Sequence, residues 1–387
     1  MNSKTESEVK LKVSGLDNFS FAETKLSHVN GEEGHLIIGG YPVQDLAKTT
    51  SFEALCHLLL RGSLPNHHEL KEMSERLGEQ RVNVFPLLGL TCQTTKDFAT
   101  RGSIRTLPTN GMDYLRAALA GLDVGEESDD HAIKMIAAMA VAAAAWNRLR
   151  LGLHPIAPDP QLSHADDYLR MAVGTKPDPR LSAALNSYFV TVADHGMNAS
   201  TFTARVIAST GSDLASSIVG GIGALKGPLH GGAPGPVLEM LEEIGTPENA
   251  EIWLERELQA GRRIMGMGHR IYRVRDPRAA VLEKAILQLE EAGIKSRRLS
   301  LARAVEKAAA ALLAKRYPDR ALKANVEFYT AVILDAIGLP PELFSPTFAC
   351  GRVVGWCAHV DEQRKFGRLV RPQSTYVGTL NQPNKGA

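Results

Sequence analysis

The sequence has almost no net charge and few aromatic residues. Its 387 residues include 44 Lys and Arg against 43 Asp and Glu, a formal net charge of +1, and only 6% are aromatic. This charge balance excludes a broad electrostatic field that would attract nucleic acid or an anionic membrane surface. We therefore expect neither as a partner, and recognition of an anion must depend on a few placed arginines or lysines.

The sequence is also poor in cysteine and in metal- or phosphate-binding motifs. Its four cysteines, Cys56, Cys92, Cys350 and Cys357, have no CxxC or Cys/His spacing of a zinc site. Neither GxGxxG nor GK[ST], the two phosphate-loop motifs, is present. We therefore expect reduced, buried thiols in a cytoplasmic protein without a metal site.

Long apolar runs are lacking as well. The longest, residues 135–146, falls short of the roughly 18 residues that suggest a membrane span. Residues 1–12 are polar and charged, so they do not form a signal peptide. Because residues 135–146 are rich in alanine, they predict a helix packed closely against other helices or against a second subunit.

Helical periodicity dominates what remains. Apolar spacing predicts helices at residues 52–61, 68–77, 113–121, 131–149, 166–173, 180–193, 200–215, 247–261, 279–292, 301–317, 327–337 and 348–363. Weak strand signals occur only at residues 10–13 and 34–38. The pattern predicts an all-α fold without the strand–helix alternation of a dinucleotide-binding protein. The length predicts about two domains, with boundaries in the Gly- and Pro-rich segments 227–236 and 338–346.

Polar residues beside glycines interrupt the apolar helices at four places. The first segment, DHGMNAS, contains His195 and is explained either as a capped helix start or as part of a site. The second, KGPLHGGAPGP, leaves the backbone around His230 open to a ligand. A histidine before a helix stays neutral and can donate a hydrogen bond to a carbonyl oxygen. A flexible domain hinge is the alternative for this segment.

The other two segments combine a histidine with arginines, and a carboxylate with apolar residues. In GMGHRIYRVRDPR, His269 follows two glycines and is followed by four arginines in nine residues. Arginine binds carboxylates or phosphates with two parallel hydrogen bonds, although a solvated basic turn has the same composition. In NVEFY, Glu327 begins an apolar helix. It either favours the helix N-terminus or acts as a desolvated general base.

The order and spacing of these segments resemble a known family. DHGMNASTFTARV, GPLHGGAP, GMGHRIYRVRDPRA, NVEFY, FACGRVVGWCAHVDEQ and RPQSTYVG together resemble the citrate synthase family, over about residues 13–378. The resemblance implies an all-α fold with a small N-terminal β-hairpin. It implies a large, dimer-forming domain of residues 1–232 and 341–387, and a small domain of residues 233–340 that closes over the active site.

The resemblance also implies the reaction and its catalytic residues. Acetyl-CoA would condense with oxaloacetate, and hydrolysis of citryl-CoA would release citrate and CoA, without a tightly bound cofactor. His230 would hydrogen-bond the thioester carbonyl, Glu327 would remove the α-proton, and His269 would polarise the keto group of oxaloacetate.

Further residues are implied to bind the two substrates. His195, Arg278, Arg352 and, from the other subunit of a homodimer, Arg371 would hold the oxaloacetate carboxylates. Arg273 corresponds in position to a basic residue that meets the phosphates of CoA.

The sequence departs from the family pattern at the proposed base. Glu327 stands where the family usually has Asp, and NVEFY resembles a minor bacterial branch. The extra methylene moves the carboxylate by about 1 Å, which can cost on the order of 10²-fold in rate, so we expect an active but slower enzyme. Two alternatives remain: a 2-methylcitrate synthase that uses propionyl-CoA, since a pocket discriminates one methylene by only ~1–3 kcal/mol, and a non-catalytic paralogue.

Overall fold

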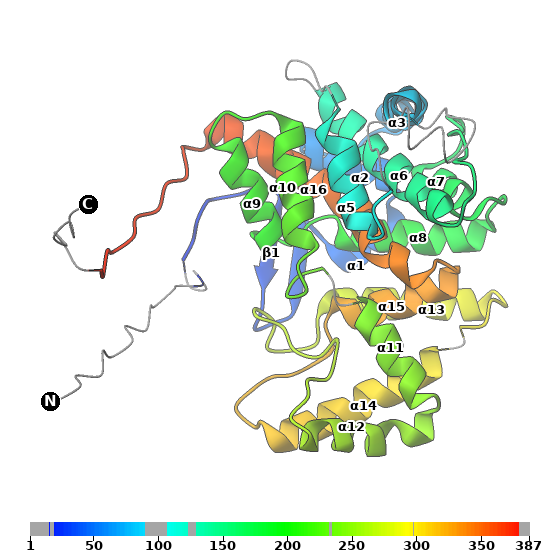
Figure 1. Cartoon of the computed structure of the whole chain (residues 1–387), viewed down its shortest axis with the longest axis vertical. Coiled ribbons are helices and arrows are strands. Elements are labelled where there is room, and N and C mark those ends of the chain that lie inside the picture. The colour runs from blue at the N-terminus through cyan, green and yellow to red at the C-terminus, as the bar shows by residue number, and fades with distance from the viewer. Residues whose placement is uncertain are drawn as a thin grey trace, which may run out of the picture.

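The computed structural model describes residues 15, 19–89, 107–122, 129–231, 234–296 and 298–378, and it is mainly helical (Figure 1). A small antiparallel sheet of β1 (Ser27–Asn30), β2 (His35–Ile38) and β3 (Tyr41–Pro42) comes first, in the order β1-β2-β3. The helices that follow are α1 (Val43–Thr49), α2 (Phe52–Arg61), α3 (His67–Leu87), α5 (Gly111–Ala120), α6 (Asp129–Arg150), α7 (His164–Val173), α8 (Pro179–Val192), α9 (Ala199–Ala208), α10 (Leu214–Leu225), α11 (Pro234–Ile244), α12 (Ala250–Gln259), α13 (Pro277–Glu291), α14 (Leu299–Arg316), α15 (Val326–Ile337) and α16 (Phe344–Phe366). The predicted all-α class with an N-terminal hairpin is confirmed.

One predicted helix is wrong. Residues 200–215 do not form a single helix: α9 ends at Ala208 and α10 begins at Leu214. Gly211 lies between them with a φ of +80°, and the side chain of Asp213 accepts a hydrogen bond from the Ser216 N–H to start α10. The short helix α1, most of α10 and the strand β1 were not predicted, whereas the helix expected after His230 is α11. The predicted strand at residues 10–13 lies outside the described residues.

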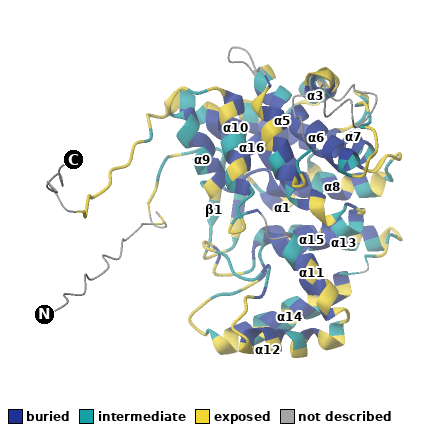
Figure 2. Ribbon diagram, in the orientation of Figure 1, coloured by how far each residue is buried: buried dark blue, intermediate teal, exposed yellow. Residues whose placement is uncertain are grey.

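The two longest buried helices, α6 and α16, form the core. Figure 2 shows buried residues along much of both, and nearly every residue of α6 from Ile133 to Trp146 is buried. Within the described part of the chain, α6 is long and apolar enough to cross a membrane, but 83% of its apolar stretch is buried inside the protein. It packs on α3, α5, α7 and α16, so the Ala-rich sequence serves close packing within this chain.

Two glycines let α16 lie against the end of α8. A Cβ added at Gly355 would lie 2.2 Å from the carbonyl oxygen of Ala193, and one at Gly351 would lie 2.6 Å from the Val192 side chain. Both distances are shorter than van der Waals contact, so a side chain at either position would separate the helices. The close crossing brings polar residues of α16 next to Asp194, which follows α8.

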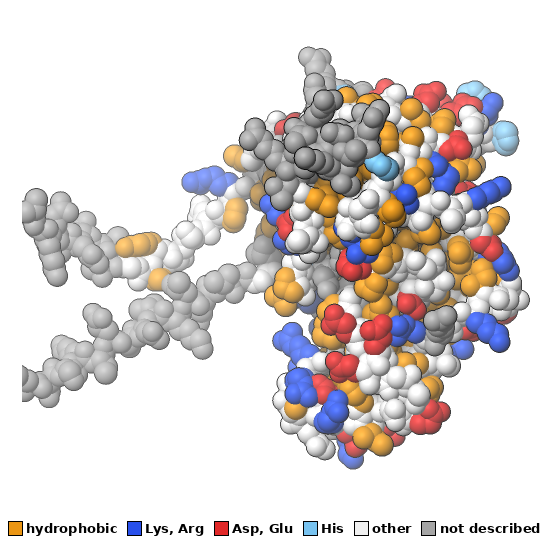
Figure 3. Space-filling model, turned by 45° about the vertical axis from the view of Figure 1, so that its right-hand side comes forward, with side chains coloured by type: hydrophobic (Ala, Val, Ile, Leu, Met, Phe, Trp, Pro, Cys, Tyr) orange, Lys and Arg blue, Asp and Glu red, His pale blue; other side chains and the backbone are white. Residues whose placement is uncertain are grey.

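The helices are not spread evenly along the molecule. α11, α12 and α14 lie together at one end, and α13 and α15 lie between them and the remaining helices (Figure 1). The proposed small domain, residues 233–340, contains these five helices, and its movement as a unit stays a prediction. On the face shown in Figure 3, acidic and basic side chains are interspersed, as expected from the balanced charge.

The predicted state of the cysteines holds for the three that the structure describes. Cys56, Cys350 and Cys357 are free and buried. Burial raises the pKa of each thiol above its ordinary value. Cys92 lies outside the described residues.

A buried ion pair holds the loop before α7. Arg81 on α3 donates from Nε to Asp167 Oδ2 at 2.8 Å, and from Nη2 to the Leu162 carbonyl at 2.7 Å. The two side chains are 1% and 0% exposed. Asp167 also accepts from Arg170 Nη2 at 2.6 Å, so loss of Arg81 would leave the buried carboxylate with one of its two guanidinium partners.

We expect Arg81→Met to lower the free energy of unfolding by about 1–3 kcal/mol, because the buried Asp167 carboxylate keeps Arg170 but loses its second guanidinium partner, and the Leu162 carbonyl loses its donor. Urea denaturation followed by circular dichroism measures the change. Arg76→Met is the matched control on the same helix, because Arg76 pairs with the half-exposed Glu72 and Asp130 and should contribute less than about 1 kcal/mol. Equal effects of the two substitutions would contradict the prediction.

Candidate active site

Three aromatic rings from two loops meet in the interior. His195 lies just after α8, and His269 and Tyr272 lie in the loop before α13. The ring centres of His195 and His269 are 5.4 Å apart, and those of His269 and Tyr272 are 4.8 Å apart. The Tyr272 hydroxyl is 3.0 Å from His195 Nε2, so the loop before α13 is fixed against the end of α8.

Backbone groups determine which nitrogen of His269 carries the proton. His269 Nδ1 accepts hydrogen bonds from the N–H groups of Ile271 at 3.0 Å and Tyr272 at 3.2 Å. Burial, with a further contribution from Arg278, lowers the pKa of His269 to about 4. The ring is therefore neutral near pH 7, with its proton on Nε2 as a donor for a ligand.

His230 is held in the opposite tautomer. Its Nε2 lies 3.3 Å from the backbone nitrogen of Ser200 and 2.8 Å from Ser200 Oγ. Because the Ser200 N–H donates to Nε2, the proton of the neutral ring lies on Nδ1. Trp356 Nε1 donates to Ser200 Oγ at 3.1 Å and fixes the hydroxyl in turn.

The neutrality of His230 has a different cause from the one expected. The sequence-based argument relied on the N-terminal dipole of the following helix. In the structure, burial lowers the pKa of His230 to about 4, with further contributions from Arg352 and Arg278. The neutral state was therefore predicted correctly, and nearby guanidiniums help to produce it.

The two buried arginines differ in how they are paired. Arg278 makes two hydrogen bonds with the Asp276 carboxylate, from Nε at 3.0 Å and from Nη2 at 2.7 Å. Arg352 donates from Nε to the Val192 carbonyl at 2.5 Å and stacks 4.9 Å from the Phe348 ring centre. Its Nη2 is buried without a hydrogen-bond partner, so Arg352 offers an unsatisfied donor to an anion.

Glu327 is the second buried charged group with an unsatisfied atom. It lies in the first turn of α15, is 9% exposed, and its Oε2 has no hydrogen-bond partner. Burial raises its pKa to about 7, against the opposing effects of Arg278 and Arg352. A carboxyl group with a pKa near 7 can accept a proton at neutral pH, as a general base must.

These predicted residues share one electrostatic environment. The charge of Arg278 affects the pKa values of His195, His230, His269 and Glu327. Arg352 affects those of His195, His230 and Glu327. The structure therefore brings six predicted residues together, with three histidines and Glu327 around the guanidiniums of Arg278 and Arg352. Among the described residues, no group of three or more His, Cys, Asp or Glu side chains is arranged to hold a metal ion.

Comparison with known proteins assigns the family. The family described as "Citrate synthase, C-terminal domain" matches residues 15–373. The chain belongs to the citrate synthase family. This confirms the resemblance of the sequence motifs and an enzyme of the citrate synthase type.

Relatives and solved structures agree over almost the whole chain. Citrate synthase of Deinococcus radiodurans is 36% identical over 379 residues, covering 95% of this chain and 96% of that protein. The crystal structure of citrate synthase from Thermotoga maritima has a TM-score of 0.82 and 33% identity, covering 95% of this chain and 96% of its own. A ternary complex of Thermoplasma acidophilum citrate synthase with carboxymethyl coenzyme A and oxaloacetate has a TM-score of 0.84 and 27% identity, covering 95% and 97%.

Two residues matched to the citrate synthase pattern lie outside the buried cluster. Arg371 is exposed, in a C-terminal segment that extends away from the helical body after α16 (Figure 1). Arg273 is also exposed, with its Nε 4.0 Å from the Glu32 carboxylate. A single chain therefore contributes two of the three predicted oxaloacetate arginines to the buried cluster.

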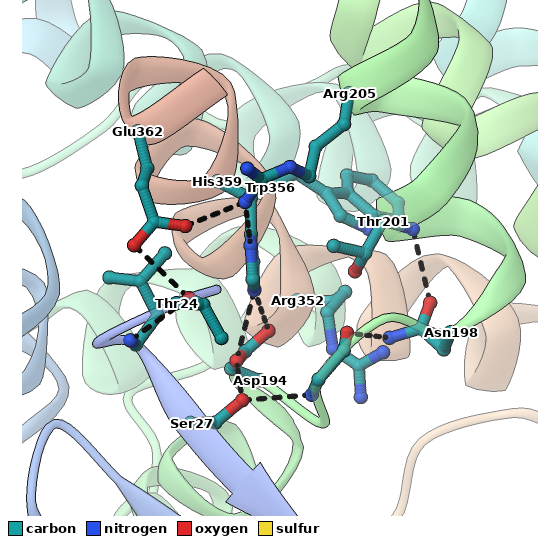
Figure 4. Close-up of polar contacts among 12 residues, drawn as sticks. Thr24, Ser27, Asp194, Asn198, Thr201, Arg205, Arg352, Trp356, His359 and Glu362 are labelled. Atoms are coloured by element: carbon teal, nitrogen blue, oxygen red, sulfur yellow. Dashed lines mark hydrogen bonds and ion pairs between the residues drawn. The ribbon is translucent and has the colours of Figure 1, made fainter. Parts of the chain in front are cut away.

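A buried polar network behind His195 was not predicted. Asp194 accepts from His359 Nε2 at 3.2 Å and from the Ser27 hydroxyl (Figure 4). Arg205 Nη1 lies 3.0 Å from His359 Nδ1 and 2.6 Å from Glu362 Oε2. Because Arg205 can only donate, His359 Nδ1 is the acceptor and its Nε2–H donates to Asp194.

The sequence contains a partial signal for this network. His359 lies seven residues after Arg352 on α16, which places both on about the same face of the helix, and Glu362 follows three residues later. Polar residues at helical spacing in a helix that is otherwise apolar indicate buried polar contacts. Their partners, Asp194 and Arg205, are distant in sequence and were not identifiable without the fold.

We expect Asp194→Asn to destabilise the protein by roughly 1.5–3 kcal/mol near neutral pH, because it removes a buried charged acceptor. Burial acts to raise the pKa of Asp194, but His359 and Ser27 outweigh it and hold the pKa below its ordinary value. The stabilisation should be fully present above about pH 5 and lost as the pH falls through the lowered pKa.

Urea unfolding of both proteins between about pH 3 and pH 7 measures this difference. The difference in free energy of unfolding between the parent and the Asp194→Asn variant should become smaller at acid pH. Asp361→Asn on the same helix is the control, since Asp361 is 51% exposed and pairs with the exposed Lys365. If this difference in free energy of unfolding were the same at every pH, the charge of Asp194 would not be the cause of the destabilisation.

Proposed function

We propose that this protein condenses acetyl-CoA with oxaloacetate and hydrolyses the resulting citryl-CoA to citrate and CoA. The observation that carries the proposal is the pair of unsatisfied buried atoms, Arg352 Nη2 and Glu327 Oε2. The Arg352 donor would be satisfied by an anion, and the Glu327 oxygen can accept a proton because its pKa is raised to about 7. Membership of the citrate synthase family identifies a reaction class that needs both groups, a cation to bind a carboxylate substrate and a base to remove a proton.

Oxaloacetate would bind through its two carboxylates. Arg278, held by Asp276, and Arg352, with its free Nη2, supply two guanidiniums from one chain. Arg371 of a second subunit would supply a third, which is consistent with its exposed position on the extended C-terminal segment. This arrangement requires a homodimer, and closure of the proposed small domain would exclude water from the site.

The three catalytic groups would then act in sequence. Glu327 removes a proton from the acyl α-carbon; the electron pair of that C–H bond forms the C=C bond of the enolate, and the C=O π pair moves onto the thioester oxygen. The Nδ1–H of His230 donates to that oxygen and stabilises the enolate. The α-carbon then attacks the keto carbon of oxaloacetate, whose oxygen receives the Nε2 proton of His269. Water attacks the thioester carbonyl of citryl-CoA and the C–S bond breaks; one proton of the water leaves with the sulfur as CoA thiol, and the other is released with the new carboxylate. The proton taken up by Glu327 returns through solvent to His269, which restores both groups.

Both imidazoles are suited to these roles by being neutral. A neutral imidazole donates a hydrogen bond without the desolvation cost of a buried imidazolium beside two guanidiniums. The CoA phosphates would lie near exposed Arg273. The solved complex of Thermoplasma acidophilum citrate synthase contains carboxymethyl coenzyme A and oxaloacetate, which supports the assignment of both ligands.

The first test is release of CoA thiol from acetyl-CoA and from propionyl-CoA in the presence of oxaloacetate. We expect a higher kcat/KM for acetyl-CoA, and a loss of at least about 10²-fold in His269→Ala, because the keto group would no longer be polarised. A higher kcat/KM for propionyl-CoA would instead favour 2-methylcitrate synthesis. A parent protein without activity on either thioester would favour the non-catalytic paralogue.

The second test is the pH dependence of the reaction. Because Glu327 acts only when it is deprotonated and its pKa is about 7, kcat/KM for acetyl-CoA should rise through about pH 7 to a plateau. The two imidazoles have pKa values of about 4, so they should not limit the rate above about pH 5. Glu327→Gln should lose roughly 10²–10⁴-fold in kcat.

Glu327→Asp is the matched variant, since it keeps the charge and shortens the reach. It should change kcat more than the KM for oxaloacetate, because Glu327 acts on the acyl group. A flat profile between about pH 5.5 and pH 8.5, with Glu327→Gln as active as the parent, would rule out proton removal by this residue.

A further inference from the structure

The tip of the N-terminal hairpin contacts the loop that carries His269. A Cβ added at Gly31 would lie 2.3 Å from the carbonyl oxygen of Ile271 and 2.8 Å from its carbonyl carbon. The Arg273 N–H donates to the Gly31 carbonyl at 2.9 Å. The two backbones are therefore in direct contact, and a side chain at position 31 would have to displace backbone atoms rather than a flexible side chain.

The turn itself does not require glycine at this position. Gly31 does not have a positive φ, unlike Gly34 at the end of the same turn. Asn30 shapes the turn: its Oδ1 accepts from the N–H groups of Glu32 at 3.2 Å and Glu33 at 3.1 Å, and its Nδ2 donates to Glu33 Oε2 at 2.8 Å. An alanine would fit this conformation, so the restriction to glycine comes from the docked loop.

The docked part of the loop is the part that fixes the His269 tautomer. Ile271 and Tyr272 supply the two N–H groups that His269 Nδ1 accepts. The ends of the loop are held elsewhere, since the Gly268 N–H donates to the Lys323 carbonyl at 2.7 Å and the Asp276 N–H donates to the Ala324 carbonyl at 3.2 Å. The hairpin therefore supports the loop between these two ends.

We propose that Gly31 is a positioning residue for His269. Because Gly31 has no side chain, the Ile271 carbonyl can pack against its α-carbon. This contact keeps the Ile271 and Tyr272 N–H groups directed at His269 Nδ1. The imidazole proton therefore stays on Nε2, from which it would be donated to oxaloacetate. The hairpin contacts the same loop at a second point, because a Cβ added at Gly34 would lie 2.6 Å from the Val274 side chain. The proposal rests on the role proposed for His269 in the reaction.

The test compares Gly31→Ala with the parent protein in two measurements. The added methyl group displaces Ile271, so kcat should fall roughly 10- to 100-fold, as expected for a shift of about 1 Å at a catalytic group. The KM for acetyl-CoA should stay within about twofold. In ¹⁵N NMR of labelled histidines, with His269 assigned by its loss in His269→Gln, the parent should show one tautomer and Gly31→Ala a mixture or the other tautomer.

Gly121→Ala is the control for a glycine replacement as such. A Cβ there meets no atom within 4 Å, and its φ is −92°, so kcat and the histidine spectrum should equal those of the parent. Asn30→Ala is a second variant that adds no bulk. This substitution removes the hydrogen bonds that shape the turn, so it should shift the His269 signals in the same direction as Gly31→Ala. It provides the test if the Gly31→Ala protein does not fold.

The outcomes separate this proposal from the proposed function. Parent-like kcat and parent-like His269 signals in a folded Gly31→Ala protein would overturn the positioning role. A lower kcat with unchanged His269 signals would also overturn it, because the effect would then be general. If the parent protein releases no CoA thiol, the proposed reaction is wrong, yet the histidine spectra still decide whether Gly31 sets the His269 tautomer.

Discussion

The site depends on two buried guanidinium groups that share little negative charge. Arg278 has the Asp276 carboxylate in direct contact, whereas Arg352 bonds a backbone carbonyl and stacks on Phe348. Removing a cation from water costs several kcal/mol unless anions surround it. A dianionic ligand would supply the missing charge, in keeping with the oxaloacetate proposed above.

The surrounding groups adjust to this positive field. Burial and the guanidiniums keep His230 and His269 neutral, while burial outweighs the same guanidiniums at Glu327 and raises its pKa. Both imidazoles accept hydrogen bonds from backbone N–H groups, at Nε2 in His230 and at Nδ1 in His269. Because amide N–H groups do not titrate, these tautomers should hold over a wide range of pH.

Local signals in the sequence were sufficient for the fold class, whereas the residues of the cluster were identified from the order and spacing of several motifs, which resemble those of the citrate synthase family. Apolar spacing located most helices, and glycines beside His230 and His269 marked the loops that carry them. Helix ends that depend on a single turn, such as Gly211 after α9, were missed because the apolar pattern continues across the break. The contacts of Asp194 with His359 and of Gly31 with Ile271 join residues far apart in the chain, so no local pattern encodes them.

Helix α16 combines several requirements in one short stretch. Gly351 and Gly355 allow its close crossing of α8, Arg352 would bind the proposed substrate, and His359 bonds Asp194. A residue inserted or deleted between Gly351 and His359 would rotate one group relative to another by about 100°, the angle per residue of an α-helix. This part of the chain should therefore tolerate some substitutions but no change in length during evolution.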